Sequence, residues 1–176
     1  MSFTGSQLDS DQILQDLLDR VRNRFYGKYR GIVTDIDHST WRIKASVPNV
    51  LPGTDTGWCM PCVPYAGPQV GFLMLPEKGS AVWIEFEGGD PSYPIWTGMF
   101  WSSGDLPSAA SADVKSIVTS AGSIAFDDKG SSITLTDAQN NTVVLDSDGV
   151  TTTSGANSVA VGTSTVNVNN GALEVM

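Results

Sequence analysis

The feature that most constrains the fold is a repeat of short segments, between residues 117 and 176, in which apolar and polar residues alternate. SIAFDD, SITLTD, SVAVG and TVNVN are examples, and this period of two is typical of strands with one buried face. The region after Ser108 has no Pro and one aromatic residue, a composition typical of disorder. A regular β-repeat is nevertheless predicted, because the leading apolar residues are 7 to 10 positions apart: Ile124, Ile133, Val143, Val150, Val159, Val166 and Leu173.

Each repeat supplies only one apolar pair, such as Val159 and Val161, which cannot bury both faces of a sheet. Other copies of the chain can supply the apolar surface that a core needs. Three chains wrapped about one axis turn every pair inward and leave Ser, Thr, Asn and Asp outside. The sequence therefore predicts a homotrimeric, intertwined β-helix shaped as a triangular prism. Its predicted trimer core is Ile124, Phe126, Ile133, Leu135, Val143, Leu145, Val159, Val161, Val166 and Val168.

Residues 28–103 have a different composition, with all five Trp and eight of the nine Pro. Short β-branched and aromatic runs alternate with turn signals such as PEKG and EGGDPSYP, which is typical of a small β-barrel. We expect strands near RGIVTDI, WRIKASV, VGFLML, SAVWIEFE and PIWTGMFW. The segment 104–116 is expected to be a linker, and 117–176 is the predicted trimeric β-helix. Because both the barrel and the β-helix consist of strands, the predicted fold class is all-β.

One amphipathic helix is predicted in the N-terminal segment 1–27. Apolar residues recur at helical spacing over 9–25, Ser10 is a suitable cap at the start, and Gly27 a suitable stop at the end. The barrel is too small to cover the whole apolar stripe. We therefore expect four residues to contact a partner protein or a neighbouring chain: Leu14, Leu17, Leu18 and Val21.

Net charge excludes several classes of function. At a formal charge of -9 and a pI near 4.3, most of the surface repels phosphate, so no nucleic-acid partner is expected. No apolar run approaches the ~20 residues of a membrane span, and the start lacks the features of a signal peptide. We expect synthesis in a cytoplasm, without a signal peptide. Two Cys and one His are too few for a structural zinc site, and no metal or other cofactor is expected.

Two stretches together carry a resemblance to a known family. GIVTDIDHSTWRIKASVPNV, followed by MPCVPYAGPQVGFLMLPEKGSAVWIEFEGGDPSYPIWTGMFW, resembles the OB-fold of the central spike proteins of contractile tails. That family includes phage baseplate assembly protein V and the tail-spike part of type VI secretion spikes. The most specific piece is the succession PYAG, LPEKGSAVWIEFEGGD and PIWTG. An N-terminal helix before the barrel and a β-helix after it also fit the family.

The resemblance implies a structural protein without enzymatic activity. It implies a homotrimer at the baseplate of a phage virion tail or an extracellular injection particle, which touches the target membrane transiently as it pierces the cell envelope. Type VI spikes have their hub domains fused ahead of the barrel. Only about 28 residues precede the barrel here, so a separate hub protein is expected, and it or a neighbouring chain would contact the helix. Some relatives carry a lysozyme domain after the barrel, but only a linker follows Trp101 here. Other relatives end in a tip with an iron ion held by paired His residues, and this sequence lacks such a pair. A PAAR-like tip protein is therefore expected on a platform of Leu173, Val175 and Met176.

Other interpretations are weaker. Cys59 and Cys62 have thioredoxin-like spacing, but Pro64, Gly67 and Pro68 forbid the helix that such a motif needs. Glu85 and Glu87 share a strand face, which is more typical of a solvated surface than of a glycosidase pair. Basic residues near Trp41 leave one alternative function open, an OB-fold that binds nucleic acid or glycan and carries an oligomerising β-tail. The basic residues are Arg20, Arg22, Arg24, Lys28, Arg30, Arg42 and Lys44.

Overall fold

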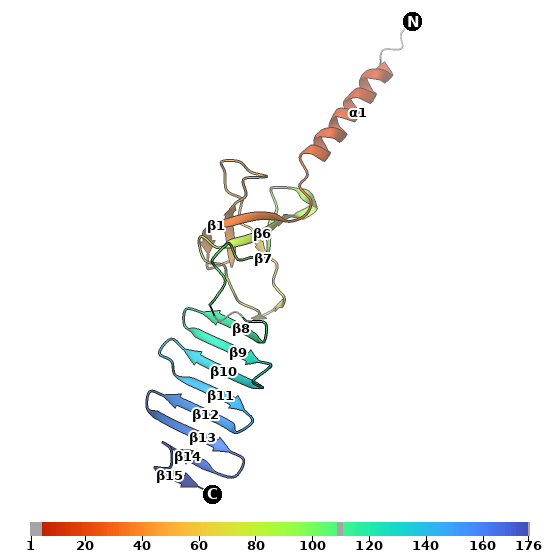
Figure 1. Ribbon diagram of the computed structural model, residues 1–176. Helices are drawn as coiled ribbons and strands as arrows, with labels where there is room; N and C mark the ends of the chain where they lie inside the picture. The colour runs from red at the N-terminus through yellow and green to blue at the C-terminus, as the bar shows by residue number, and fades with distance from the viewer. Residues whose placement is uncertain (1–4, 109–110, 176) are drawn as a thin grey trace. The chain divides into compact units, whose positions relative to one another are not determined.

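The computed structural model describes residues 5–108 and 111–175. The chain divides into two compact units between Gly104 and Asp105. The first unit contains one helix and a curled sheet, and the second contains a single long antiparallel sheet (Figure 1). The fold is all-β apart from the N-terminal helix, as the sequence predicts.

Helix α1 spans Gly5–Arg22. The prediction was wrong at both ends, because α1 begins before Ser10 and stops before Phe25. Phe25 belongs to the barrel: its N–H donates to the Gly89 carbonyl over 2.8 Å, and its ring lies 6.3 Å from that of Phe86. Packing of this partly buried ring against the barrel core thus outweighs three more helical positions.

The barrel sheet has five strands in the order β2-β1-β6-β7-β3. Neighbours are antiparallel except β3 and β7, which are parallel. A short hairpin, β4 with β5, and a 3-10 turn, η1, complete the unit. The bounds are β1 Tyr29–Asp37, β2 Arg42–Ser46, β3 Met60–Pro61, β4 Ala66–Gly67, β5 Val70–Gly71, β6 Ala81–Phe86, η1 Glu87–Gly89 and β7 Pro94–Met99.

The segment 59–62, which contains the edge strand β3, contacts both β2 and β7. The Cys59 N–H donates to the Ile43 carbonyl on β2 over 2.8 Å, and the Cys62 N–H donates to the Trp96 carbonyl on β7 over 2.9 Å. The edge strands therefore have backbone partners, as the closed arrangement of an OB barrel requires. The core that they enclose comprises Val33, Ile43, Ala45, Val47, Val50, Cys59, Val82, Ile84, Phe86 and Trp96.

The predicted strand VGFLML is largely absent. Only Val70–Gly71 is a strand, paired with Ala66–Gly67, and Phe72, Leu73 and Met74 are exposed and not in a strand. The prediction rested on an apolar run between turn signals and was wrong here, because the segment is apolar at every position from Phe72 to Leu75 and no polar face exists to align it in a sheet.

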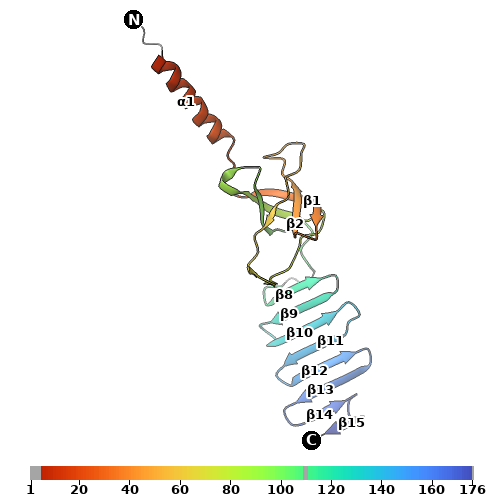
Figure 2. The same cartoon turned by 180° about the vertical axis from the view of Figure 1, so that it is seen from behind.

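The second unit is one eight-stranded antiparallel sheet whose strands follow one another in chain order (Figures 1 and 2). The repeat predicted seven of these strands. The first, β8, was missed, and it begins at Val114, inside the segment expected to be a linker. The bounds are β8 Val114–Thr119, β9 Gly122–Asp127, β10 Ser132–Asp137, β11 Thr142–Asp146, β12 Gly149–Ser154, β13 Asn157–Gly162, β14 Val166–Val168 and β15 Leu173–Val175.

Aspartate side chains fix the turns between these strands. The Asp127 carboxylate accepts from the Gly130 N–H over 2.8 Å, and that of Asp146 accepts from the Asp148 N–H over 2.9 Å. Asp137 accepts from the Asn141 N–H over 2.8 Å and from its side-chain amide over 2.7 Å, and these hydrogen bonds lower the pKa of Asp137. These aspartates therefore act as turn formers.

Candidate functional site

The candidate functional site is one face of the C-terminal sheet, on which apolar side chains form two columns. Residues directly opposite each other on neighbouring strands share a face, so the register defines the columns. The first is Phe126, Ile133, Leu145, Val150, Val161, Val166 and Val175. The second is Ile117, Ile124, Leu135, Val143, Thr152, Val159, Val168 and Leu173. We call this surface the apolar face.

All ten residues predicted for the trimer core lie on the apolar face. In the single chain most of its side chains are between 37% and 48% exposed. The opposite face carries mostly small or polar residues at the matching positions, such as Ser116, Thr134 and Thr151, with Val118 and Val144 as apolar exceptions. A continuous apolar surface of this extent is typical of a protein–protein interface.

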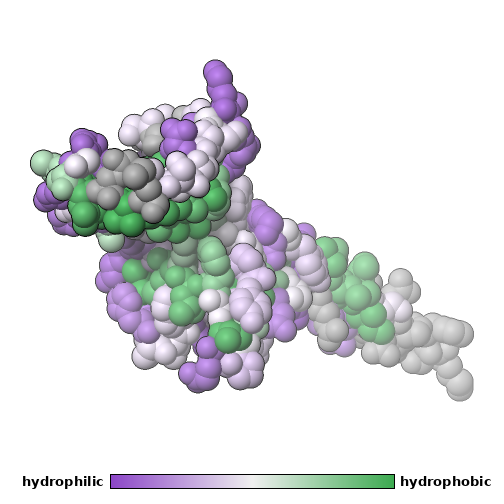
Figure 3. Space-filling model, turned by 90° about the horizontal axis from the view of Figure 1, so that it is seen from below, coloured by the Kyte–Doolittle hydropathy of each residue, from purple (hydrophilic) through white to green (hydrophobic). Residues whose placement is uncertain are grey.

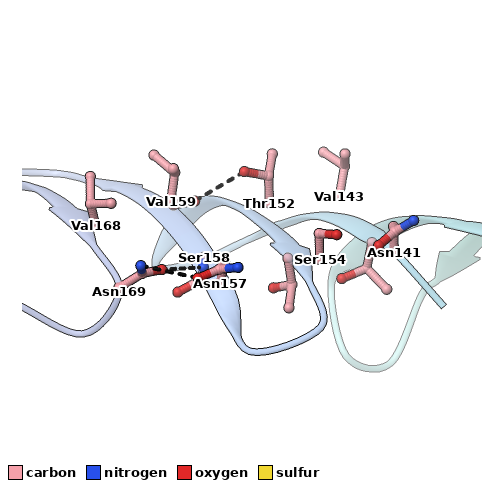
Figure 4. Close-up of a pocket in the computed structure, with 11 residues that line it drawn as sticks. Asn141, Val143, Thr152, Ser154, Asn157, Ser158, Val159, Val168 and Asn169 are labelled. Atoms are coloured by element: carbon pink, nitrogen blue, oxygen red, sulfur yellow. Dashed lines mark hydrogen bonds between the residues drawn. The ribbon is translucent and has the colours of Figure 1, made fainter. Parts of the chain in front are cut away.

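Thr152 is the polar residue within the second column. Figure 4 shows Val143, Thr152, Val159 and Val168 pointing to the same side. The Thr152 hydroxyl donates to the Val159 carbonyl over 3.5 Å, within its own sheet. The column therefore continues through Thr152, whose hydroxyl already has a partner.

A polar network lies beside this column, at the edge of a shallow opening of about 420 Å³ (Figure 4). The Asn169 side chain accepts from the Ser158 N–H over 2.9 Å and donates to the Asn157 side chain over 3.2 Å. These contacts join the start of β13 to the residue that follows β14. The network thus has a structural role.

Lys115 marks the N-terminal limit of the apolar face. It lies opposite Phe126 in the register, where the first column would otherwise gain another apolar residue. Its ammonium group forms an ion pair with Asp128 and donates to the Ala112 carbonyl. This lysine also interrupts the alternation of β8, which explains why the repeat did not reveal that strand.

The stripe on α1 is the second candidate surface. Leu14, Leu17, Leu18 and Val21 are between 44% and 73% exposed. Figure 3 shows apolar side chains on the surface of the helix. No described residue outside α1 covers them, and their role as a partner site stays a prediction.

The predicted tip platform lies at the last strand. Leu173 and Val175 are 59% and 57% exposed and end the two columns. Met176, the third predicted member, lies outside the described residues. In the part of the chain that the structure describes, β15 has β14 as its sole sheet neighbour.

The candidate reactive groups have structural surroundings. Cys59 is buried, burial raises the pKa of its thiol to about 11, and the Thr56 hydroxyl lies 3.2 Å from its sulfur. The thiol is therefore protonated at neutral pH and unsuited to redox chemistry. Glu85 forms an ion pair with Lys28 over 2.7 Å rather than an acid–base pair with Glu87. Among residues 5–108 and 111–175, no three His, Cys, Asp or Glu side chains are grouped to hold a metal ion.

Several cations of the basic group are engaged within the barrel unit. Arg24 pairs with Asp90 over 3.1 Å, and this contact contributes, after the Ser92 hydrogen bonds, to the lowered pKa of Asp90. Lys44 lies over the Trp58 ring, with its nitrogen 4.8 Å from the ring centre, and Arg30 lies over Trp83. These contacts use cations that a phosphate-binding surface would need. Within the described residues, no helix is both long and apolar enough to cross a membrane.

Two family matches cover most of the chain. Residues 29–101 match the type VI secretion system/phage-baseplate injector OB domain. Residues 116–174 match the phage baseplate V C-terminal trimerisation domain. The comparison with curated proteins gives no match. The trimerisation match coincides with the sheet that carries the apolar face, and it identifies the chain as a homotrimer.

Proposed function

Because the chain belongs to the phage baseplate V family of structural spike proteins, we propose that it is the central spike that pierces the target cell envelope when a contractile tail contracts. Its place is the tail of a phage virion or a related injection particle. The spike is seated on a separate hub protein and touches the target membrane only transiently.

One observation carries this proposal: the injector OB domain is followed directly by a sheet with an apolar face along its whole length. In a trimer three such faces bury one another, and each chain keeps its polar face outside. A rod of this kind resists unfolding, because removing one chain exposes two apolar columns in the remaining pair. Mechanical resistance is what puncture requires.

The exposed stripe on α1 supports the proposal that the N-terminal helix attaches the chain to a partner. Its four predicted contact residues are exposed, and an amphipathic helix suits a groove on a partner or a neighbouring spike chain. The hub is the expected partner.

The last strand supports a separate tip protein. β15 ends the sheet with exposed Leu173 and Val175, and a strand with an unpaired edge can continue into a partner by backbone hydrogen bonds. A PAAR-like cap would cover both features. Deleting residues 171–176 should abolish recruitment of the cap and leave the trimer intact, whereas particles whose spike ends bare would contradict the cap.

The function is tested on assembled particles. Cryo-electron microscopy should locate three copies of the chain at the baseplate axis, in contact with the hub, and particles lacking the chain should fail to kill or infect target cells. Absence of the chain from purified particles would contradict the proposal. Salt-dependent binding of single-stranded oligonucleotides by the purified protein would instead favour the alternative function.

A further inference from the structure

The β4–β5 hairpin and the residues around it carry exposed apolar side chains on the barrel unit. Backbone pairing of Ala66 with Gly71 shapes the hairpin, and the Phe72 N–H donates to the Tyr65 carbonyl over 2.8 Å. Five large side chains are exposed there, with Leu73 the most exposed at 68%. We call them the hairpin patch: Tyr65, Val70, Phe72, Leu73 and Met74.

The hairpin patch has no charged residue within it or near it in sequence. The run 56–76 contains no Asp, Glu, Lys or Arg, and it is the longest such run in the barrel unit. The longest in the chain is 149–173, which lies inside the match to the trimerisation domain. Copies of a chain with a net charge of -9 repel one another, so contacts between copies favour uncharged surfaces.

The trimer also holds the barrels close together. The barrel ends with β7 at Met99 and the sheet begins with β8 at Val114, so the connecting segment spans at most about 50 Å. Once the sheets are joined, each barrel is near its two copies at an effective concentration of about a millimolar. A modest apolar contact is populated under these conditions.

We propose that the three hairpin patches of a trimer pack against one another around the three-fold axis. Residues that lie at a three-fold axis meet the same residues of the other two copies. The occupant of each patch is therefore a second copy of this chain, and this contact between barrels adds to that of the sheets.

The test uses the purified full-length trimer with no other protein. Leu73→Cys is introduced together with Cys62→Ser, which removes the exposed native thiol, and buried Cys59 reports on folding by staying unreactive. The matched control is Tyr93→Cys, at a barrel residue that is 62% exposed and lies outside the patch. A short bis-maleimide should link chains through Leu73→Cys and not through Tyr93→Cys. A maleimide dye should react about tenfold more slowly with Leu73→Cys than with Tyr93→Cys.

Two further arms identify the occupant. In a chain made monomeric by Ile133→Asp, the thiol of Leu73→Cys should react as fast as the control, whereas persistent protection would show that the chain covers its own patch. Fast reaction without cross-links in the purified trimer overturns the proposal. Protection that appears only in assembled particles would then identify the hub as the occupant, and protection only with phospholipid vesicles would identify a membrane.

Discussion

Gly149 on β12 lies against the Val161 carbonyl on β13 so closely that a β-carbon at Gly149 would overlap that oxygen. Its φ of +134° is also a conformation that side-chain-bearing residues rarely adopt. Gly162 pairs with Gly149 in the register. A β-carbon at Gly162 would make only ordinary contacts, the nearest at 3.5 Å from the Asp148 carbonyl oxygen.

Gly149→Ala should therefore destabilise the C-terminal sheet by about 3 kcal/mol, because the strands must separate and the backbone is strained. Gly162→Ala is the matched control and should change stability little. Differential scanning calorimetry measures both as shifts in unfolding temperature. Equal shifts would contradict the close approach of β12 and β13.

Ile133→Asp should dissociate the trimer, because it brings three charges into the shared core. Thr134→Asp adds the same charge to the opposite face of the same strand and should leave the trimer intact. Sedimentation velocity distinguishes the two results. A trimeric Ile133→Asp protein would show that the apolar face is not the interface.

Asp37 predicts a pH dependence for the barrel. Hydrogen bonds from Ser39 and Thr40 lower the pKa of Asp37 from 3.8 to about 2. A carboxylate with a lowered pKa contributes stability that is fully present above pH 3.8 and is lost as the pH falls toward about 2. Asp37→Asn should flatten this part of the stability profile, followed by fluorescence of the five Trp, all within the barrel. An unchanged profile would contradict the assignment.

Leu17→Asp combined with Leu18→Asp should prevent incorporation of the spike into particles, because both charges fall on the α1 stripe. Gln12→Asp with Gln15→Asp adds the same charge away from that stripe and should be tolerated. Immunoblots of purified particles measure incorporation. Normal incorporation of the double leucine variant would show that the stripe is dispensable.

The sheet could be predicted because its period decides which face each residue occupies. A shift of one residue would move Val159 and Val161 to the polar face, so alternation specifies the face, and the turns between the strands complete the register. The same rule failed at β8, where Lys115 occupies an apolar position and its ammonium group turns aside to Asp128. A long side chain such as that of Lys115 can reach a polar partner from an apolar position, and the pattern of residue types does not predict such a contact.

The errors in the first unit have a common cause. Phe25 has the spacing of the helical stripe, yet its ring packs on Phe86, far away in sequence. Phe72 and Leu73 have the composition of a buried strand, yet they are exposed. A tertiary contact decides the position of Phe25, and composition does not decide whether Phe72 and Leu73 are buried, so the local pattern lacked the information in both cases.

The oligomeric state is tested most directly by the mass of the purified full-length chain, measured by light scattering beside a chain truncated after Gly104. We predict a trimer, at about three times the 18.7 kDa of one chain, for the full-length protein. The truncated chain should be monomeric or weakly associated, since it lacks the apolar face. A full-length monomer of 18.7 kDa would contradict the account.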